Sequence, residues 1–343
     1  MRMHGACRKR EARRHAGLQQ GRTSMHEHGG LRDGNAKKMP TNLKERKSEV
    51  TRLNSDCMSC ILKKELEHFP EDLPEDQRLL YKQKVLLLVG NAKPTMSPSE
   101  ITGKIYEIQK KMFGRQVDYP GIKSFFNNKM MQYAEKTERW IREADDPLLR
   151  AIQFSMCGNY IDFGLPEAVE EQKLDQLLRE SDQISVGEAM LSEIREELGK
   201  ARSLVFLHDN CGEIVMDKLL LKEIRRQYPQ LELISVVRGR EVLNDVTIED
   251  AEEVGLSEVA RILPNGDDVA GTCLERISGE CLETLEKADV ILAKGQGNFE
   301  TLRGCGYNVF YLFLCKCELF QNRFHVPAFT GMVIHEREAG FVL

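Results

Sequence analysis

The sequence predicts an all-helical N-terminal domain, residues 51–200, followed by an α/β domain, residues 201–343, with a mainly parallel sheet. Two observations predict this fold class. Apolar residues recur at helical spacing through the first segment, whereas short apolar runs of strand length alternate with helical stretches in the second. Alternating strands and helices predict parallel pairing with helices on the faces of the sheet, because a parallel connection needs a crossover.

Residues 1–50 form a basic segment with thirteen Lys/Arg against five Asp/Glu, a net charge of +8. The segment has almost no Ile, Val or Phe, so it cannot bury enough apolar surface to offset its ordering entropy. We therefore expect a disordered basic tail, or a start codon assigned too early, with Met25 and Met39 as later candidates. An organelle transit peptide and a nucleic-acid-binding arm are the alternatives.

The helical domain contains one clear helix start. Ser97-Pro98-Ser99-Glu100 has the pattern of a capping box with proline at the first helical position. Behind it, an apolar stripe repeats at helical spacing: Ile101, Ile105, Ile108 and Met112. Further helices are predicted over residues 125–143, 147–156 and 186–200, with a loop at 158–164.

The α/β domain begins with a short apolar run, Ser203–Leu207, followed by a helix with one apolar side. Later strands are predicted at Glu232–Val237, 259–263, 290–293 and Val309–Leu314. In sheets of this kind, ligands bind beyond the carboxyl ends of the strands. The residues that follow these strands are therefore the first candidates for a functional site.

Composition narrows the class of partner. The chain of 343 residues has a net charge of −5, so the part after the basic tail carries −13. An acidic body argues against nucleic acid as the main ligand. No apolar run approaches the roughly 18 residues that span a bilayer, so we expect no membrane segment. Ten scattered cysteines without a secretory leader favour a reducing compartment, with the cytoplasm as the expected location.

Polar residues follow three of the predicted strands. Asp209 and Asn210 come after the first strand, and Asp245 follows the second after a short loop. Two carboxylates and an amide oxygen are hard ligands suited to Mg²⁺ or Mn²⁺. Lys294, after a later strand, and Arg238 would then neutralise phosphate oxygens.

The glycines after Lys294 fit the same interpretation. Gly295 and Gly297 would let the backbone approach a phosphate closely, and a helix starting at Phe299 would add a favourable dipole. Each feature also has a purely structural explanation. Asp209-Asn210 would be a helix cap, Asp245 a turn residue, and the glycine-rich segment an ordinary strand-to-helix turn.

Several known motifs are excluded. The dinucleotide fingerprint would need glycine where Glu300 stands, and no P-loop pattern exists. An aspartyl-phosphate enzyme with an Asp-x-Asp motif would need a carboxylate at Cys211. His208 precedes Asp209, but strand alternation places its side chain on the opposite side of the strand. No Gly-x-Ser-x-Gly nucleophile elbow is present.

The cysteines allow three interpretations. Cys57 and Cys60 supply half of a zinc site, and Cys315 and Cys317 are a possible second half. A redox pair is the second possibility, and structural thiols are the third.

Together the motifs resemble the damage-control phosphatases, long called domain of unknown function 89. The resemblance covers about residues 53–335 and rests on three runs: Asp209-Asn210-Cys211-Gly212-Glu213, Arg238 to Thr247, and Lys294-Gly295-Gln296-Gly297-Asn298-Phe299-Glu300. Residues 158–164 and the Cys57-Met58-Ser59-Cys60 motif resemble the prokaryotic subgroup with an N-terminal CxxC.

The resemblance implies a Rossmann-like three-layer α/β/α domain preceded by a helical part. It implies a divalent metal (Mn, Mg, Co or Ni) held by Asp209, Asn210 and Asp245. It also implies a phosphatase acting on phosphate monoesters of small metabolites, such as sugar phosphates or damaged phosphometabolites. The implied substrate- and phosphate-binding residues are Asn159, Asp162, Glu213, Arg238, Lys294, Gly295 and Asn298. Asn159 and Asp162 either line the substrate side of the pocket or cap a helix.

The expected mechanism is in-line attack by a metal-activated water, with Asp209 or Asp245 as base and Lys294 stabilising the developing charge. A carboxyl methyltransferase is the second enzymatic possibility, although residues 209–213 offer only one glycine for a nucleoside-binding loop. A non-enzymatic nucleic-acid or protein-binding module led by the basic tail is the third.

Overall fold

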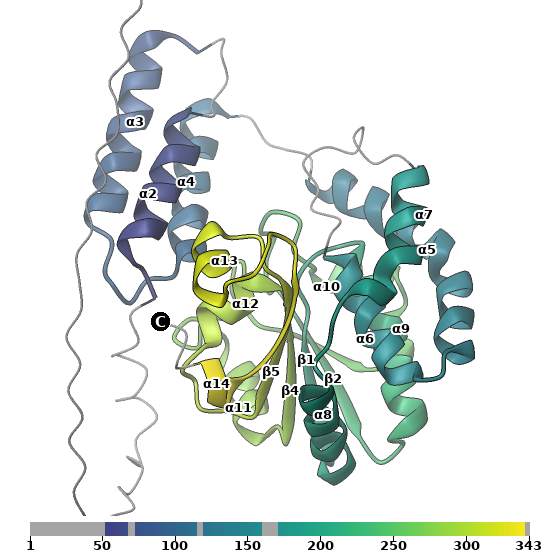
Figure 1. The fold of residues 1–343 in the computed structure, drawn as a ribbon. Coiled ribbons are helices and arrows are strands. Elements are labelled where there is room, and N and C mark those ends of the chain that lie inside the picture. The colour runs from purple at the N-terminus through teal and green to yellow at the C-terminus, as the bar shows by residue number, and fades with distance from the viewer. Residues whose placement is uncertain (1–51, 68–72, 115–118, 160–170, 340–343) are drawn as a thin grey trace, which may run out of the picture. The chain divides into compact units, whose positions relative to one another are not determined.

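The computed structural model describes residues 52–67, 73–114, 119–159 and 171–339 (Figure 1). These residues belong to one compact unit that begins at Asn42. The predicted basic tail, residues 1–50, lies outside the described residues. None of the described helices is both long and apolar enough to cross a membrane.

Helices α2 (Ser55–Glu67), α3 (Glu75–Gly90) and α4 (Pro98–Phe113) share a small apolar core. Tyr81 and Val85 of α3 pack there with Ile101 and Ile105 of α4. The predicted capping box at the start of α4 is confirmed. The Glu100 backbone N–H donates to Ser97 Oγ at 3.2 Å, and the Ser97 N–H donates to Glu100 Oε2 at 2.8 Å.

The remaining helices before the sheet cover the three segments predicted at 125–143, 147–156 and 186–200, the first of them starting earlier than predicted, and include a further helix at 171–179 that was not predicted. They are α5 (Tyr119–Glu143), α6 (Pro147–Gly158), α7 (Glu171–Arg179) and α8 (Glu188–Lys200). Helix α6 continues through Gly158, where a loop was expected, and residues 160–164 of that expected loop lie outside the described part of the chain.

The α/β part contains six strands and their connecting helices. In chain order these are β1 (Ser203–Leu207), α9 (Glu213–Gln227), β2 (Glu232–Val237), α10 (Ile248–Glu253), β3 (Arg261–Pro264), α11 (Gly279–Lys287), β4 (Val290–Lys294), α12 (Gly295–Leu302), β5 (Val309–Leu314), α13 (Glu318–Phe324), β6 (Gly331–His335) and α14 (Glu336–Ala339). The strand order is β3-β2-β1-β4-β5-β6, with β1 to β5 parallel and β6 antiparallel to β5. The predicted α/β class with a mainly parallel sheet behind a helical region is confirmed.

Both faces of the sheet are buried. Leu204 and Phe206 of β1 join one apolar cluster with α5, α6, α8 and α9, whereas Val205 and Leu207 join a second cluster with α11, α12 and α13 (Figure 1). Successive strand residues point to opposite faces, so one strand supplies both clusters. Helices α5, α6 and α8, which precede residue 200, therefore share a core with the sheet that follows it. The domain boundary at residue 200 stays a prediction.

Two sequence expectations were wrong in detail. Strand β6 was not predicted, because it is a short edge strand whose first three residues are only half-buried and give no clear apolar run. Helix α12 begins at Gly295 rather than Phe299. The Asn298 side chain donates to the Lys294 carbonyl at 2.7 Å, which stabilises the first turn of α12.

Candidate active site

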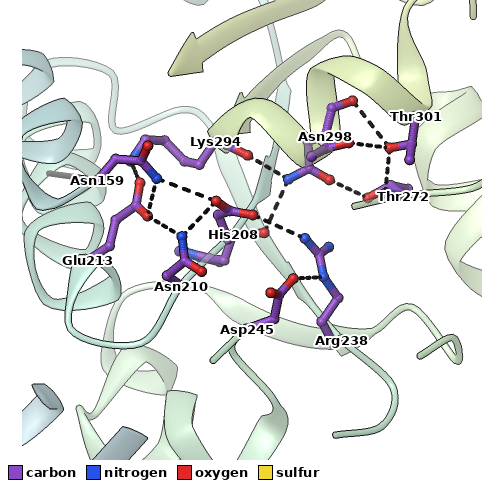
Figure 2. Close-up of polar contacts among 12 residues, drawn as sticks. Asn159, His208, Asn210, Glu213, Arg238, Asp245, Thr272, Lys294, Asn298 and Thr301 are labelled. Atoms are coloured by element: carbon purple, nitrogen blue, oxygen red, sulfur yellow. Dashed lines mark hydrogen bonds and ion pairs between the residues drawn. The ribbon is translucent and has the colours of Figure 1, made fainter. Parts of the chain in front are cut away.

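The candidate site lies at the carboxyl ends of β1, β2 and β4 (Figure 2). Asp209 and Asn210 follow β1, Arg238 directly follows β2, and Lys294 is the last residue of β4. The chain moves outward in opposite directions from β1 and from β4, so these two central strands form the switch point of the sheet. Switch points of this kind are where open α/β sheets bind ligands.

Asp245 reaches the site through backbone pairing. The segment around Asp245 runs antiparallel to the segment after β1, with a bridge between Asn210 and Asp245. The Val246 N–H donates to the Asp209 carbonyl at 2.9 Å, and the Cys211 N–H donates to the Asn244 carbonyl at 2.9 Å. This pairing holds the Asp209 and Asp245 carboxylates at the same place, although the two residues are 36 positions apart in the chain.

Arg238 joins the two carboxylates. Its Nε donates to Asp245 Oδ2 at 2.6 Å, and its Nη2 lies 3.5 Å from Asp209 Oδ1. The remaining Nη1 is buried without a hydrogen-bond partner among the described residues. An unpartnered buried guanidinium N–H costs on the order of 1–3 kcal/mol, so this atom is a candidate contact for an anionic ligand.

Two amides connect Asp209 with Glu213, at the start of α9. Asn210 Nδ2 donates to Asp209 Oδ2 at 2.8 Å and approaches Glu213 Oε2 at 3.3 Å. Asn159, at the end of α6, donates from Nδ2 to Glu213 Oε2 at 2.9 Å and approaches Asp209 Oδ2 at 3.4 Å. Both amides direct their N–H groups at carboxylates, and the Asn210 Oδ1 points away from them (Figure 2). Asp162, the other residue of that predicted pair, lies outside the described residues.

Lys294 is fully buried, and its ammonium group makes three hydrogen bonds within the protein. Its Nζ donates to the Ser155 carbonyl at 2.9 Å, to Asp217 Oδ1 at 2.8 Å, and to Glu213 Oε1. An ammonium group has three protons, so these contacts use all of them. A direct phosphate contact, as expected from the sequence, would require Lys294 to exchange one of these partners.

Behind Lys294 lie Asp217, Ser155 and Ser235, which the sequence interpretation missed, together with His208, which it had placed on the opposite side of the strand from Asp209. Asp217 accepts from Ser155 Oγ at 2.6 Å, and its Oδ2 lies 3.1 Å from His208 Nδ1. His208 Nε2 lies 3.0 Å from Ser235 Oγ on β2. One sequence signal was available for Asp217: it stands four residues after Glu213, so both carboxylates lie on the same face of α9.

Two further predicted residues fix the backbone around the site. Gly295 has φ +76°, and a Cβ on it would lie 1.9 Å from Asp209 Oδ2. The absence of a side chain at Gly295 therefore makes room for the Asp209 carboxylate. Asn298 is buried, donates to the carbonyls of His208 (3.2 Å) and Lys294 (2.7 Å), and accepts from Thr272 Oγ1 at 2.8 Å. Both ends of this amide thus bind the protein and hold the ends of β1 and β4 together.

Burial and neighbouring charges shift the pKa values of three carboxyl groups in the site. It raises the pKa of Asp209 well above the ordinary range, and the neighbouring carboxylates of Asp245 and Glu213 add to the rise. Burial also raises the pKa of Asp245, against the opposing effect of Arg238. The pKa of Asp217 is instead lowered, because Lys294 and His208 outweigh its burial.

The buried charges do not balance. Four buried carboxylates (Asp209, Glu213, Asp217 and Asp245) face two buried cations, Lys294 and Arg238. Counted as ionised, the four carboxylates therefore exceed these two cations by two negative charges. One divalent cation would restore neutrality, and the Asp209, Asn210 and Asp245 oxygens are the hard ligands such an ion prefers.

The cysteine motif lies outside this site. Cys57 and Cys60 are on α2, and all nine cysteines that the structure describes are free thiols. Burial raises the pKa of Cys57 to about 11. Within the described ranges, no three His, Cys, Asp or Glu side chains are arranged to hold a metal, so the cysteines form no preassembled metal centre there.

The chain is thus an α/β protein with helices on both faces of its sheet and a buried acidic site at the switch point, where proteins of this class bind ligands. The sequence of residues 53–328 matches the family described as the damage-control phosphatase ARMT1-like domain. The match covers more than half of the chain, so the chain belongs to that family.

Relatives of this chain and one solved structure agree with this family assignment. A damage-control phosphatase of Archaeoglobus fulgidus is 31% identical over 271 residues, which is 76% of this chain and 91% of that protein. Damage-control phosphatase PH1575 of Pyrococcus horikoshii is 31% identical over 209 residues, 57% of this chain and 71% of that protein. The crystal structure of PH1575, titled a DUF89 family protein, aligns with a TM-score of 0.67 at 25% identity and covers 83% of this chain and 99% of that one. The CxxC subgroup stays a prediction.

Proposed function

We propose that this chain is a divalent-metal-dependent phosphatase that hydrolyses phosphate monoesters of small metabolites, such as sugar phosphates or damaged phosphometabolites. The observation that carries the proposal is the charge imbalance. A buried cluster whose ionised carboxylates exceed its cations by two is costly unless protons or a cation join it, and a divalent cation restores neutrality with all four carboxylates ionised. Membership of the damage-control phosphatase family supports the reaction class.

Asp209, Asn210 and Asp245 would hold the metal, with the Asn210 amide turned so that its Oδ1, in place of the N–H that now faces Asp209, is directed at the ion. Their two carboxylates and one amide oxygen suit Mg²⁺, Mn²⁺, Co²⁺ or Ni²⁺, whose geometric preferences overlap. When bound, such an ion supplies polarisation of the phosphoryl group and a water of lowered pKa. Asp209 or Asp245 would accept the proton of the attacking water, because their carboxylates are the acidic groups beside the proposed ion.

Arg238 is the proposed phosphate ligand. Its Nη1 is buried and has no partner within the described residues, while Nε and Nη2 of the same guanidinium contact Asp245 and Asp209. A phosphate oxygen would satisfy that N–H and place the ester next to the ion. A planar guanidinium held by two carboxylates is also preorganised for an oxyanion.

The other residues position this machinery. Lys294 holds Glu213 and Asp217, Glu213 accepts from Asn159 and Asn210, and both amides reach Asp209. We therefore assign Lys294 a positioning role instead of the phosphate contact expected from the sequence. Asn159 and Asp162 are proposed to face the substrate. Cytoplasmic location belongs to the same proposal, and the free thiols suit a reducing compartment.

The structure gives one reason to prefer this function to a methyltransferase. The Gly212 N–H, in the turn after β1, donates to Asn127 Oδ1 of α5 at 2.7 Å. A side chain of the protein thus occupies the place where a nucleoside-binding loop would need open backbone N–H groups. A binding module led by the basic tail predicts that deleting residues 1–50 abolishes function, whereas the phosphatase proposal predicts unchanged phosphate release.

The test is phosphate release from a panel of sugar phosphates and cofactor-precursor phosphates, with and without Mn²⁺. Asp209→Asn should lower phosphate release by about 100- to 1000-fold and weaken Mn²⁺ binding measured by calorimetry, while the matched control Glu283→Gln, at an exposed carboxylate on α11, should change neither. Folded wild-type protein that binds Mn²⁺ but releases no phosphate from any ester would contradict the phosphatase activity and leave the metal site standing. Folded protein that neither binds Mn²⁺ nor releases phosphate would contradict both.

A further inference from the structure

Helix α3 has two apolar faces. Tyr81, Val85 and Val89 form the buried face, which packs in the core that α3 shares with α2 and α4. The opposite face carries four exposed leucines: Leu79 (55% exposed), Leu80 (46%), Leu86 (49%) and Leu87 (68%). Only seven large apolar side chains are exposed in the described ranges, and four of them are on this one helix. We call these four residues the leucine face.

The leucine face is symmetric about Gln83. Leu79 and Leu87 each stand four residues from Gln83, and Leu80 and Leu86 each stand three residues from it. At 3.6 residues per turn, all four lie within about 60° of the direction of Gln83. Gln83 is itself exposed, so the centre of the face is accessible. A pattern that reads the same in both directions matches a second copy of itself running antiparallel.

Such a pairing is isologous, with each leucine pair occurring twice about a two-fold axis. Leu79 would pack on Leu87 of the partner subunit, and Leu80 on Leu86 of the partner subunit. Gln83 would lie on the axis and meet its own copy. A glutamine amide has both donor and acceptor, so it can bind an identical amide and fix the register, as polar core residues do in coiled coils.

The charges along α3 favour the same orientation. Glu75 and Asp76 are exposed in the first turn, and Lys93 is exposed beyond the last turn. An antiparallel pair places the acidic end of each helix beside Lys93 of the partner subunit, and it also opposes the two helix dipoles. Lys82 and Lys84 stand about 100° to either side of Gln83, at the edges of the face, where they can stay in water.

We propose that the leucine face of α3 is a dimerisation surface that binds the same face of a second copy of this chain in antiparallel orientation. One four-turn helix is a small interface, below the size of most stable complexes, so we expect a dissociation constant on the order of micromolar. The inference rests on α3 alone and does not depend on the proposed phosphatase activity.

The first test is the mass of the full chain by sedimentation equilibrium across concentration. A shift from monomer to dimer between about 1 and 100 µM supports the proposal. A monomer throughout this range overturns the proposal. That result is expected if another segment of the same chain covers the leucine face. A fixed mass larger than the dimer overturns it as well.

The second test determines the orientation. Leu79→Glu and Leu87→Lys should each be monomeric, because each puts two charges against leucines in the homodimer. Mixed in equal amounts they should pair again, since residue 79 of one then faces residue 87 of the other. Phe125→Lys, a substitution of another exposed apolar residue (44%), should keep the wild-type behaviour.

Circular dichroism checks that each variant is folded. A folded Leu79→Glu variant that still dimerises overturns the proposed surface, and a mixture that stays monomeric overturns the antiparallel register. If either variant is unfolded, Gln83→Cys replaces it. Crosslinking of position 83 to itself by a thiol-specific reagent supports the axis, and no crosslink above the wild-type level overturns it.

Discussion

Two lysines among the described residues are fully buried, and their surroundings differ in one respect. Lys294 binds Glu213 and Asp217, whose side chains are both fully buried. Lys123 of α5 binds Asp250 at 2.6 Å and Glu241 at 3.0 Å, and the Glu241 side chain is 54% exposed. Both lysines have a raised pKa, because their carboxylate partners outweigh burial.

The two clusters differ in how their carboxylates can be stabilised when the lysine charge is removed. Around Lys123 water reaches one carboxylate, so the cluster can be rehydrated. Around Lys294 both contacting carboxylates are fully buried, so lost charge can be balanced only by protonation or by an incoming cation. A buried lysine alone therefore does not identify a functional site. The excess of buried carboxylates over cations is what distinguishes the proposed site around Lys294.

The largest expected effect is on stability, from removing each lysine in turn. Lys294→Met leaves two sealed carboxylates without their cation and should lower the free energy of unfolding by about 3–5 kcal/mol. Lys123→Met should cost less, about 1–3 kcal/mol, because Glu241 can turn to water. Urea unfolding of both variants in chelator measures the difference. Equal losses would show that the two clusters are equivalent and would refute the comparison.

The next effect separates activity from stability. Asp209→Asn removes a proposed metal ligand and should lower kcat/KM by about 100- to 1000-fold. The same change removes one excess negative charge, so the metal-free variant should be at least as stable as the wild type. Phosphate release and thermal unfolding in chelator test the two halves. A metal-free variant that is clearly less stable would contradict the charge imbalance.

Gly295→Ala should have a smaller effect at the same carboxylate. The new Cβ would lie 1.9 Å from Asp209 Oδ2, at a φ of +76° that side chains rarely adopt. We expect a loss of about 1–3 kcal/mol in unfolding free energy and weaker Mn²⁺ binding. The matched control is Gly103→Ala on α4, where a Cβ meets nothing within 4 Å. It should stabilise the protein by up to about 1 kcal/mol and leave Mn²⁺ affinity unchanged.

The last effect concerns pH. Burial raises the folded-state pKa of Asp209 and Asp245 above the ordinary value of 3.8. The folded state therefore holds these protons more tightly than the unfolded state. Their contribution to stability is present below pH 3.8 and is lost as the pH rises through the raised pKa values.

This dependence can be isolated by subtraction. The metal-free wild type should lose stability relative to Asp209→Asn as the pH rises above 3.8, by about 1.4 kcal/mol for each unit of pKa elevation. Saturating Mn²⁺ should remove that loss, because a bound cation favours the ionised carboxylates. Denaturant unfolding across pH measures both curves. Parallel curves for the two metal-free proteins would rule out a raised pKa at Asp209.

Much of the fold followed from the sequence. The bounds of β1, β2 and β5 agree with the predicted apolar runs, and the capping box of α4 is where its pattern placed it. These features are local, because side-chain periodicity and capping hydrogen bonds involve residues close in the chain. Strand β6 is the exception, since an edge strand that is half-exposed leaves no strong apolar pattern.

The sequence by itself also placed Asp209, Asn210 and Lys294 at strand ends, and hence at one edge of the sheet. Only the tertiary structure decided how they are used. It brought Asp245 to Asn210 through backbone pairing, and it directed Lys294 to Glu213 and Asp217. The physical reason is that a strand end fixes a position, whereas the partner of a buried charge depends on which helices cover it. The α6 and α9 residues that complete this site come from separate segments of the chain.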